Sequence, residues 1–459
     1  MINDSGELET RQGDKEHALG ESLAFPPLDD LLNQLRQLAQ AQPDRMALFV
    51  YGQSCAGEPL LALRIGEGPR RILAYAFPQP DEPLGGLVIL QLVRRLLQEA
   101  ALCQGATWTL LPCVDPDGAR RNEGWFTQPL ELAAYAGRHF RPPEGEQVEW
   151  SFPSSDPAWP WESVLPEARA LQALIDEERP QSLFPLHNAL LGGAYAFVSP
   201  EAASLGPSLA GVWEALGLPT HRGEAELPFA QVIGTGVFRL PDLGEMAAAL
   251  ARQGIVDPAS LLACGASPYL YGRRYGQVLT IVPELPLFVV PGIADDRPGG
   301  LSCGEVLGES LAADRAAWAG WSALYARAAP FLREDNPYRS ALESHRRATP
   351  IFLQATAAWL ASDRGLQRPA SVAEVVDGLH ATAYWRLLPL GLLRQAIAAE
   401  EGVGRLARVA AEVSGCLEKG LAGVLPVLQA TPASLESLVQ AAGAILEMAV
   451  GLPSQEIPS

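Results

Sequence analysis

Short apolar runs that alternate with helical patterns between residues 46 and 290 limit what this chain can fold into. Each run is short and rich in aliphatic or aromatic residues, as strands are, and helical patterns lie between several of them. The expected strands are "MALFVYG", "LLALRIG", "RRILAYAF", "TWTLLPCVD", "SLFPLHN", "AYAFVS" and "VLTIVPELPLFVV". Strands that alternate with helices predict a three-layer α/β domain.

The C-terminal third of the chain has a different character. Ala- and Leu-rich helical patterns with few β-branched runs fill it, and Ser371 followed by Glu374 is typical of a capping box. These patterns predict a helical bundle. We therefore expect a disordered polar tail at residues 1–24, an α/β domain at 25–305 and a helical domain at 306–459.

Composition excludes several classes of partner. Hydrophobic residues make up 48% of the chain, which is ordinary for a folded globular protein, and the formal net charge is −19. This acidity disfavours nucleic acid and anionic membranes, because both select basic surfaces. The start has no secretory pattern, and no run reaches the roughly 20 apolar residues of a membrane span, so we expect a cytoplasmic protein without a membrane segment.

Four polar stretches interrupt the apolar runs where the expected strands end. They are "PQPDEP" with Gln79 and Glu82, "DPDGARRN" at residues 115–122, "PLHN" with His187, and "VPELP" with Glu284. Ligands usually bind at this edge of an α/β sheet. Each stretch alone also has a structural explanation: a buried histidine with a hydrogen-bond partner, a carboxylate at a helix start, or a turn.

The order of the four stretches resembles the zinc carboxypeptidases of the M14 family. In that pattern His-x-x-Glu at a strand-to-helix turn precedes an Asn-Pro-Asp-Gly-like loop followed by arginine, a third-ligand histidine and a late-strand glutamate. Here Gln79 and Glu82, the loop at 115–118, His187 and Glu284 occur in that order. The resemblance covers residues 46–290. It implies a mixed-sheet zinc-carboxypeptidase-like fold and leaves the C-terminal helices unexplained.

The resemblance also implies a metal site. One zinc ion would be held by Gln79, Glu82 and His187, because zinc takes about four ligands and a catalytic site leaves one position to water. Glu284 would be the base that takes a proton from that water. The substrate would be a peptide or an amide.

Arginines after the 115–118 loop are the implied substrate contacts. Arg120 and Arg121 would hold a substrate carboxylate or the developing oxyanion, because a guanidinium matches a carboxylate in a bidentate manner. Asn122 and Arg141 are further substrate-binding candidates. Each arginine could equally be a solvated surface charge. Tyr271 is the assigned tyrosine, although the spacing leaves two neighbours open, Tyr269 and Tyr275.

Two departures from the family pattern bear on activity. Gln79 stands where the family has histidine, and a neutral amide is a much weaker zinc ligand than imidazole, so zinc would be weakly bound or absent. Asn122 is followed by Glu123, an acid where the family tends to have arginine. Three hypotheses remain: a zinc-dependent hydrolase, an inactive relative that binds a peptide or, through its C-terminal helices, a protein partner, and a scaffolding protein.

Overall fold

The computed structural model describes residues 23–157, 159–224, 230–400 and 403–451. The polar tail expected at 1–24 lies outside the described residues, apart from residues 23 and 24. Within the part that is described, no helix has the length and apolar character that crossing a bilayer requires.

A nine-stranded mixed sheet forms the centre of the α/β domain, in the order β1-β2-β4-β3-β7-β12-β9-β11-β10. The seven expected strands are all present in it. The strands are β1 (Met46–Gln53), β2 (Pro59–Ile65), β3 (Arg70–Ala76), β4 (Ala106–Leu111), β7 (Ser182–Leu186), β9 (Tyr195–Val198), β10 (Val232–Gly234), β11 (Val237–Arg239) and β12 (Leu279–Glu284).

The four central strands β4, β3, β7 and β12 run parallel. Their carboxyl ends therefore lie at one edge of the sheet. Gln79 and Glu82 follow β3, Asp115 follows β4, His187 follows β7, and Glu284 is the last residue of β12. The topology thus brings the four polar stretches to the same edge, as the sequence predicts.

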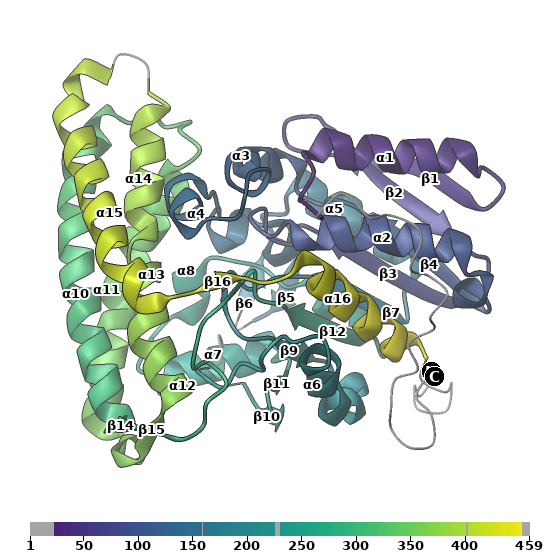
Figure 1. Cartoon of the computed structure of the whole chain (residues 1–459). Helices are drawn as coiled ribbons and strands as arrows, with labels where there is room; N and C mark the ends of the chain where they lie inside the picture. Colours follow the sequence, from purple (N-terminus) through teal and green to yellow (C-terminus); the bar gives the residue numbers. More distant parts are fainter. Residues whose placement is uncertain (1–22, 158, 225–229, 401–402, 452–459) are drawn as a thin grey trace.

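Helices cover both faces of the sheet (Figure 1). Alternate residues of β3 show this: Ile72 and Ala74 join the core beneath one set of helices, and Leu73 and Tyr75 join the core on the other side. The first face carries α1 (Leu28–Ala41), α2 (Leu84–Gln98) and α16 (Leu435–Val450), and the second carries α5 (Pro166–Glu178).

A helical bundle stands beside the α/β domain (Figure 1). Ser371 and Glu374 form the expected capping box, which begins the segment leading into a π-helix at Val376–Ala381. The predicted fold class, a mixed-sheet α/β domain with C-terminal helices, is confirmed. The bundle helices are α10 (Cys303–Ala328), α11 (Arg339–Ser362), α12 (Val372–Val375), α13 (Thr382–Trp385), α14 (Leu388–Ala398) and α15 (Ala407–Leu428).

The last helix, α16, does not lie in the bundle. It packs against α2 and α6 (Gly206–Glu214), Glu447 pairs with Arg95, and the carbonyl of Val450 accepts a hydrogen bond from Arg70. The helical spacing of its apolar residues indicates a helix but carries no information about which surface it will cover. The sequence pattern groups this helix with the bundle for that reason.

Helices α14 and α13 join the bundle to α4 (Leu132–Arg138) of the α/β domain. Gly391 lies so close to the carbonyl oxygen of Ala136 that a Cβ atom would come within 1.7 Å of it. The hydroxyl of Tyr384 donates to the carbonyl of Leu132 at 2.7 Å. These contacts fix the bundle next to the segment that contains Arg141.

The remaining α-helices and strands are short. They are α3 (Pro116–Phe126), α7 (Leu243–Arg252), α8 (Pro258–Leu262), α9 (Pro268–Gly272), β5 (Ser154–Asp156), β6 (Trp159–Trp161), β8 (Leu191–Gly192), β13 (Phe288–Val289), β14 (Pro298–Ser302), β15 (Pro369–Ser371) and β16 (Thr431–Pro432).

Candidate active site

His187 lies between two carboxylates at the edge of the sheet. Its Nδ1 atom is 2.7 Å from Glu82 Oε2, and its Nε2 atom is 3.0 Å from Glu149 Oε2. The other oxygen of Glu149 accepts a hydrogen bond from the hydroxyl of Tyr75 at 3.2 Å. Glu284 Oε1 lies 3.7 Å from His187 Nδ1. All five side chains are buried, so the sheet edge carries three glutamates around one imidazole.

A tight strand-to-helix turn places Gln79 and Glu82. The backbone N–H of Glu82 donates to the carbonyl of Gln79 at 3.1 Å, and α2 begins two residues later. Gly85 lets the first turn of α2 approach the strands, because a Cβ atom there would lie 2.6 Å from the carbonyl oxygen of Leu186. The side chain of Asn188 also accepts from the N–H of Leu84 at 3.1 Å. The helix start is thereby fixed against the end of β7, next to His187.

Arg141 compensates the acids on the outer side of this cluster. Its Nε donates to Asp81 Oδ1 at 2.8 Å, and its Nη2 donates to Glu82 Oε1 at 2.9 Å. The hydroxyl of Tyr135 donates to Asp81 at 2.6 Å. Burial alone would lower the pKa of Arg141, but the charges of Asp81 and Glu82 outweigh it and raise the pKa well above its usual range.

The electrostatics favour a proton on His187 when no cation is bound. Burial acts to lower the pKa of His187, but Glu149 and Glu82 outweigh burial and raise that pKa well above its ordinary value. Burial is also the largest cause of the raised pKa of Glu82, against the opposing effects of His187 and Arg141. The cluster therefore holds a positive charge between its carboxylates.

Among the described residues, four buried polar atoms at this edge have no hydrogen bond: Gln79 Oε1, Glu82 Oε2, Glu149 Oε2 and His187 Nδ1. Glu82 and Glu149 instead form ion pairs with His187, at 2.7 Å and 3.0 Å. An amide oxygen, a carboxylate and an imidazole nitrogen can all donate to a cation. Among the described residues, no three His, Cys, Asp or Glu side chains form a metal-binding group. A cation here would therefore need Gln79 as its third ligand.

A cavity of about 110 Å³, named here the His187 cavity, opens beside these groups. Its polar lining residues include Gln79, Glu149, His187 and Glu284 together with Tyr75, Ser267 and Thr280, and among the described residues no Lys or Arg lines it. Most of the other walls are apolar or aromatic. They include Trp150, Phe197, Leu240, Met246, Tyr269, Leu270 and Val282.

Arg120 and Arg121 do not line the His187 cavity. Arg120 pairs with Glu58 at 2.5 Å and with Asp29 at 2.8 Å. The guanidinium of Arg121 lies over the ring of Phe140, 5.4 Å from its centroid. Both side chains are thus engaged away from the cluster around His187.

Asn122 and Tyr271 also bond to groups outside the His187 cavity. Asn122 is fully buried, and its amide accepts from the N–H and donates to the carbonyl of Phe140, each at 2.8 Å. It therefore positions the residue before Arg141. Tyr271 donates to Asp176 at 2.8 Å, and of the three tyrosines considered only Tyr269 lines the cavity.

Glu149 and Asp81 are site residues that the sequence analysis missed. Glu149 lies in a short 3₁₀ turn, Val148–Trp150, within a Pro- and Gly-rich segment that reads as a loop. The sequence around Glu149 gives one indication of its role: the acid lies between two apolar residues. A carboxylate in such a place is costly to bury without a partner. Asp81 immediately precedes Glu82 but has no place in the resemblance.

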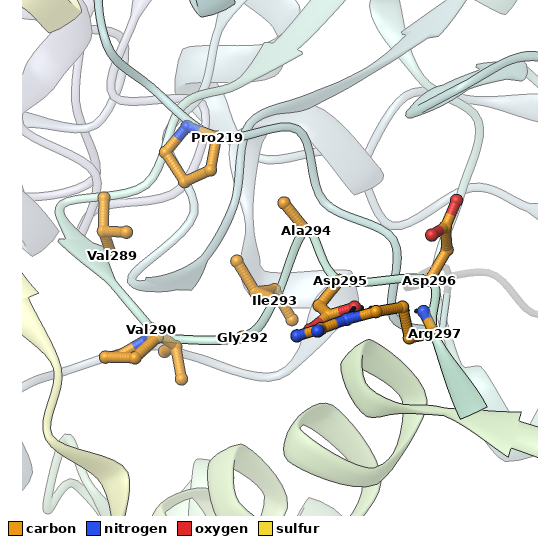
Figure 2. A pocket seen from close by; sticks show the side chains of 10 residues that line it. Pro219, Val289, Val290, Gly292, Ile293, Ala294, Asp295, Asp296 and Arg297 are labelled. Carbon is orange, nitrogen blue, oxygen red and sulfur yellow. Dashed lines mark hydrogen bonds and ion pairs between the residues drawn. The ribbon is translucent and has the colours of Figure 1, made fainter. Parts of the chain in front are cut away.

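A hollow of about 650 Å³ lies elsewhere, along residues 289–297 and Pro219 (Figure 2). Its charged residues already have partners. Arg297 donates to Asp295 at 2.9 Å, and Arg222 pairs with Asp296 at 2.8 Å. The rest of its lining within the described part of the chain is aliphatic, so no described group suited to catalysis faces it.

Residues 31–131 match the sequence model of a family described as zinc carboxypeptidase. This match confirms the predicted resemblance for the part of the chain that contains Gln79, Glu82 and the loop at 115–118. His187 and Glu284 lie beyond the matched residues. No curated protein matches the chain.

Solved structures give weaker likenesses. A metallo-carboxypeptidase from Burkholderia cenocepacia is 15% identical, with 57% of this chain and 60% of that chain covered and a TM-score of 0.35. Carboxypeptidase A from Helicoverpa armigera is 13% identical, with 57% and 65% covered and a TM-score of 0.38. The family match at residues 31–131 is therefore the comparison on which the proposal below depends.

Proposed function

We propose that this protein is a zinc-dependent hydrolase that cleaves a peptide or amide bond at the His187 cavity. One observation carries the proposal: buried ligand atoms of Gln79, Glu82 and His187 that make no hydrogen bond occur at one sheet edge, with a further acid, Glu284, 3.7 Å from His187. The family match to the zinc carboxypeptidases supports the same reading for the segment that contains the first two.

Gln79 Oε1, Glu82 Oε2 and His187 Nδ1 would hold the ion. Zinc, when bound, supplies a Lewis acid that polarises a carbonyl and lowers the pKa of a water molecule. Binding requires His187 Nδ1 without its proton. Glu149 contacts the other ring nitrogen, Nε2. It would accept a hydrogen bond from Nε2–H, which keeps the imidazole proton on that nitrogen and holds the ring in position.

Glu284 would act as the general base. It is buried at the carboxyl end of β12, lines the cavity and lies 3.7 Å from His187 Nδ1. A carboxylate at this place can accept a proton from water and return it to the leaving amine. The apolar walls exclude bulk water, which strengthens every charge interaction inside the cavity.

The substrate group that enters the His187 cavity would be uncharged or cationic. Among the described residues that line the cavity are two glutamates and no Lys or Arg. A free carboxylate would meet like charges there without a compensating cation. Arg120 and Arg121, the expected carboxylate ligands, are engaged with other groups. We therefore propose an amide or an internal peptide bond as the target.

A catalytically inactive binding protein is the second candidate. Glu82 and Glu149 can neutralise a protonated His187 without any metal, which would leave a closed ion-pair cluster. In that case the chain would keep the cavity and would bind, without cleaving, the same peptide or amide group.

Zinc content and hydrolysis separate the two candidates. We expect about one zinc ion per chain in protein purified without chelator, and hydrolysis of blocked dipeptide amides that stops when zinc is removed. Glu284→Gln should abolish hydrolysis while zinc remains bound, whereas Glu177→Gln, at an exposed glutamate of α5, should leave both unchanged. A chain without zinc at micromolar zinc, or a fully active Glu284→Gln variant, would contradict the proposal.

A further inference from the structure

A second cavity, of about 560 Å³, separates residues 135–147 of the α/β domain from the helical bundle. We name it the bundle cavity. Its volume lies within the range of small-molecule sites. It shares no lining residue with the His187 cavity. Five aromatic side chains contribute to its walls: Tyr135, Trp318, Trp321, Phe352 and Trp385.

Three buried polar atoms of its lining residues have no hydrogen-bond partner. Gln147 donates through Nε2 to the carbonyl of Pro142 at 2.8 Å, which leaves its Oε1 unpaired. His139 Nδ1 and Trp318 Nε1 are also unpaired. Gln147 and His139 are each only 3% exposed. Buried polar atoms are usually hydrogen-bonded, so these three indicate a missing partner.

Two ion pairs line the bundle cavity. Arg141 is paired with Asp81 at 2.8 Å, and Arg386 is paired with Asp314 at 2.6 Å. No ion of either sign among these four is left over. An anionic ligand would therefore lose its hydration without gaining a compensating partner, because both arginines are already paired.

The buried imidazole of His139 at the bundle cavity favours its neutral form. Burial lowers the pKa of His139 to about 4. The cavity thus combines aromatic walls with neutral polar atoms, in contrast to the acidic surface beside His187.

We propose that the bundle cavity is a binding site for a small uncharged aromatic amide. Gln147 Oε1 requires a donor, and Trp318 Nε1 requires an acceptor; an amide supplies both through its N–H and its carbonyl oxygen. The aromatic walls provide stacking or edge contacts for the ring. This site stands on its own geometry and does not depend on zinc or on hydrolysis.

Calorimetric titration of the full chain with N-acetyl-phenylalaninamide tests the site. We expect saturable binding, and the variants below separate binding in the bundle cavity from amide binding in the His187 cavity. Trp318→Phe keeps a ring but removes the N–H, and it should weaken binding about five-fold, the effect of one neutral hydrogen bond. Trp359→Phe is the matched control, because the indole N–H of Trp359 in α11 donates to Asp363, which directly follows that helix, outside the cavity.

Two further ligands test the preference for an uncharged amide with the unmodified chain. This test therefore does not require any variant to fold. N-acetyl-phenylalanine, which carries a carboxylate, should bind more weakly than the amide, and the analogue with every amide nitrogen methylated should also bind more weakly. Absence of saturable binding, equal affinity for the carboxylate, or equal weakening by Trp318→Phe and Trp359→Phe would overturn the proposal. Hydrolysis of blocked dipeptide amides, measured on the same samples, shows separately whether the proposed hydrolase function holds when binding in the bundle cavity does not.

Discussion

The bundle cavity and the His187 cavity are lined by different residues of one ion-pair cluster, and they differ in the charged side chains that line them. Arg141 and Asp81 line the bundle cavity, whereas His187, Glu149 and Glu284 line the other. In the bundle cavity the arginines and aspartates are matched. In the His187 cavity the acids outnumber the cations that line it. Among the described residues, the cavity suited to a metal ion is therefore distinguished by acids without a lining Lys or Arg, rather than by the size of the space.

Arg141 is the residue on which this contrast depends most. Arg141→Met would leave Asp81 and Glu82 buried without their shared cation, so we expect a loss of about 3 kcal/mol in the free energy of unfolding. Urea unfolding measures it. Arg120→Met is the control, since Arg120 pairs with more exposed acids and should cost about 1 kcal/mol or less. Equal losses in the two variants would remove the special role of Arg141.

Gln79 limits the metal affinity of the His187 cavity. Gln79→His would replace an amide oxygen by imidazole, a stronger zinc ligand. Zinc affinity should rise by about 100-fold, because even residues that only hydrogen-bond to the ligands change metal affinity by up to about that factor. Competition with a chromogenic chelator measures the change. Gln172→His, at a glutamine that donates to Tyr271 elsewhere, should leave affinity unchanged. No gain in Gln79→His would show that this side chain does not face the ion.

His139 gives the bundle cavity a distinct pH response. Its pKa is lowered to about 4 by burial, with Arg141 and His345 acting in the same sense and Asp81 opposing them. The unfolded chain binds this proton below about pH 6.5, so stability is full above that pH and is lost as the pH falls toward 4.

We therefore expect the unmodified chain to lose about 2 kcal/mol more than His139→Phe between pH 7.5 and pH 5. Phenylalanine can keep the stacking on Tyr135 that the imidazole makes at 5.0 Å between ring centroids. Denaturant unfolding at the two pH values measures the difference. Parallel losses in the two proteins would mean that His139 is not held neutral.

Glu149 should have the smallest effect of these changes. Glu149→Gln keeps a hydrogen-bonding group beside Tyr75 and His187 but removes the charge, and zinc affinity should fall by about 10-fold. Chelator competition again gives the value, with Glu162→Gln at an exposed position as control. An unchanged affinity would show that Glu149 does not position the imidazole.

Local patterns predicted much of the α/β domain. Alternating apolar runs gave the seven strands, and the polar residues that end them identified Gln79, Glu82, His187 and Glu284 as neighbours. Parallel strands bring their carboxyl ends together, so the order of motifs along the chain was enough to predict their proximity. The capping box at Ser371 was equally local.

Long-range contacts explain what could not be predicted. Glu149 reaches His187 from a segment without regular spacing, and Arg120 is drawn to Glu58 and Asp29, which no motif connects with it. The partner of α16 and the existence of the bundle cavity depend on how whole elements pack. Amphipathic spacing predicts a buried helix face but does not identify its partner surface.

Anomalous diffraction at the zinc edge, from crystals of the unmodified chain grown with zinc, tests the central claim most directly. We expect one peak bonded to Gln79 Oε1, Glu82 Oε2 and His187 Nδ1, at the roughly 2.0–2.2 Å typical of zinc with nitrogen and oxygen ligands. A peak held by other residues, or no peak with His187 still bridging Glu82 and Glu149, would contradict it.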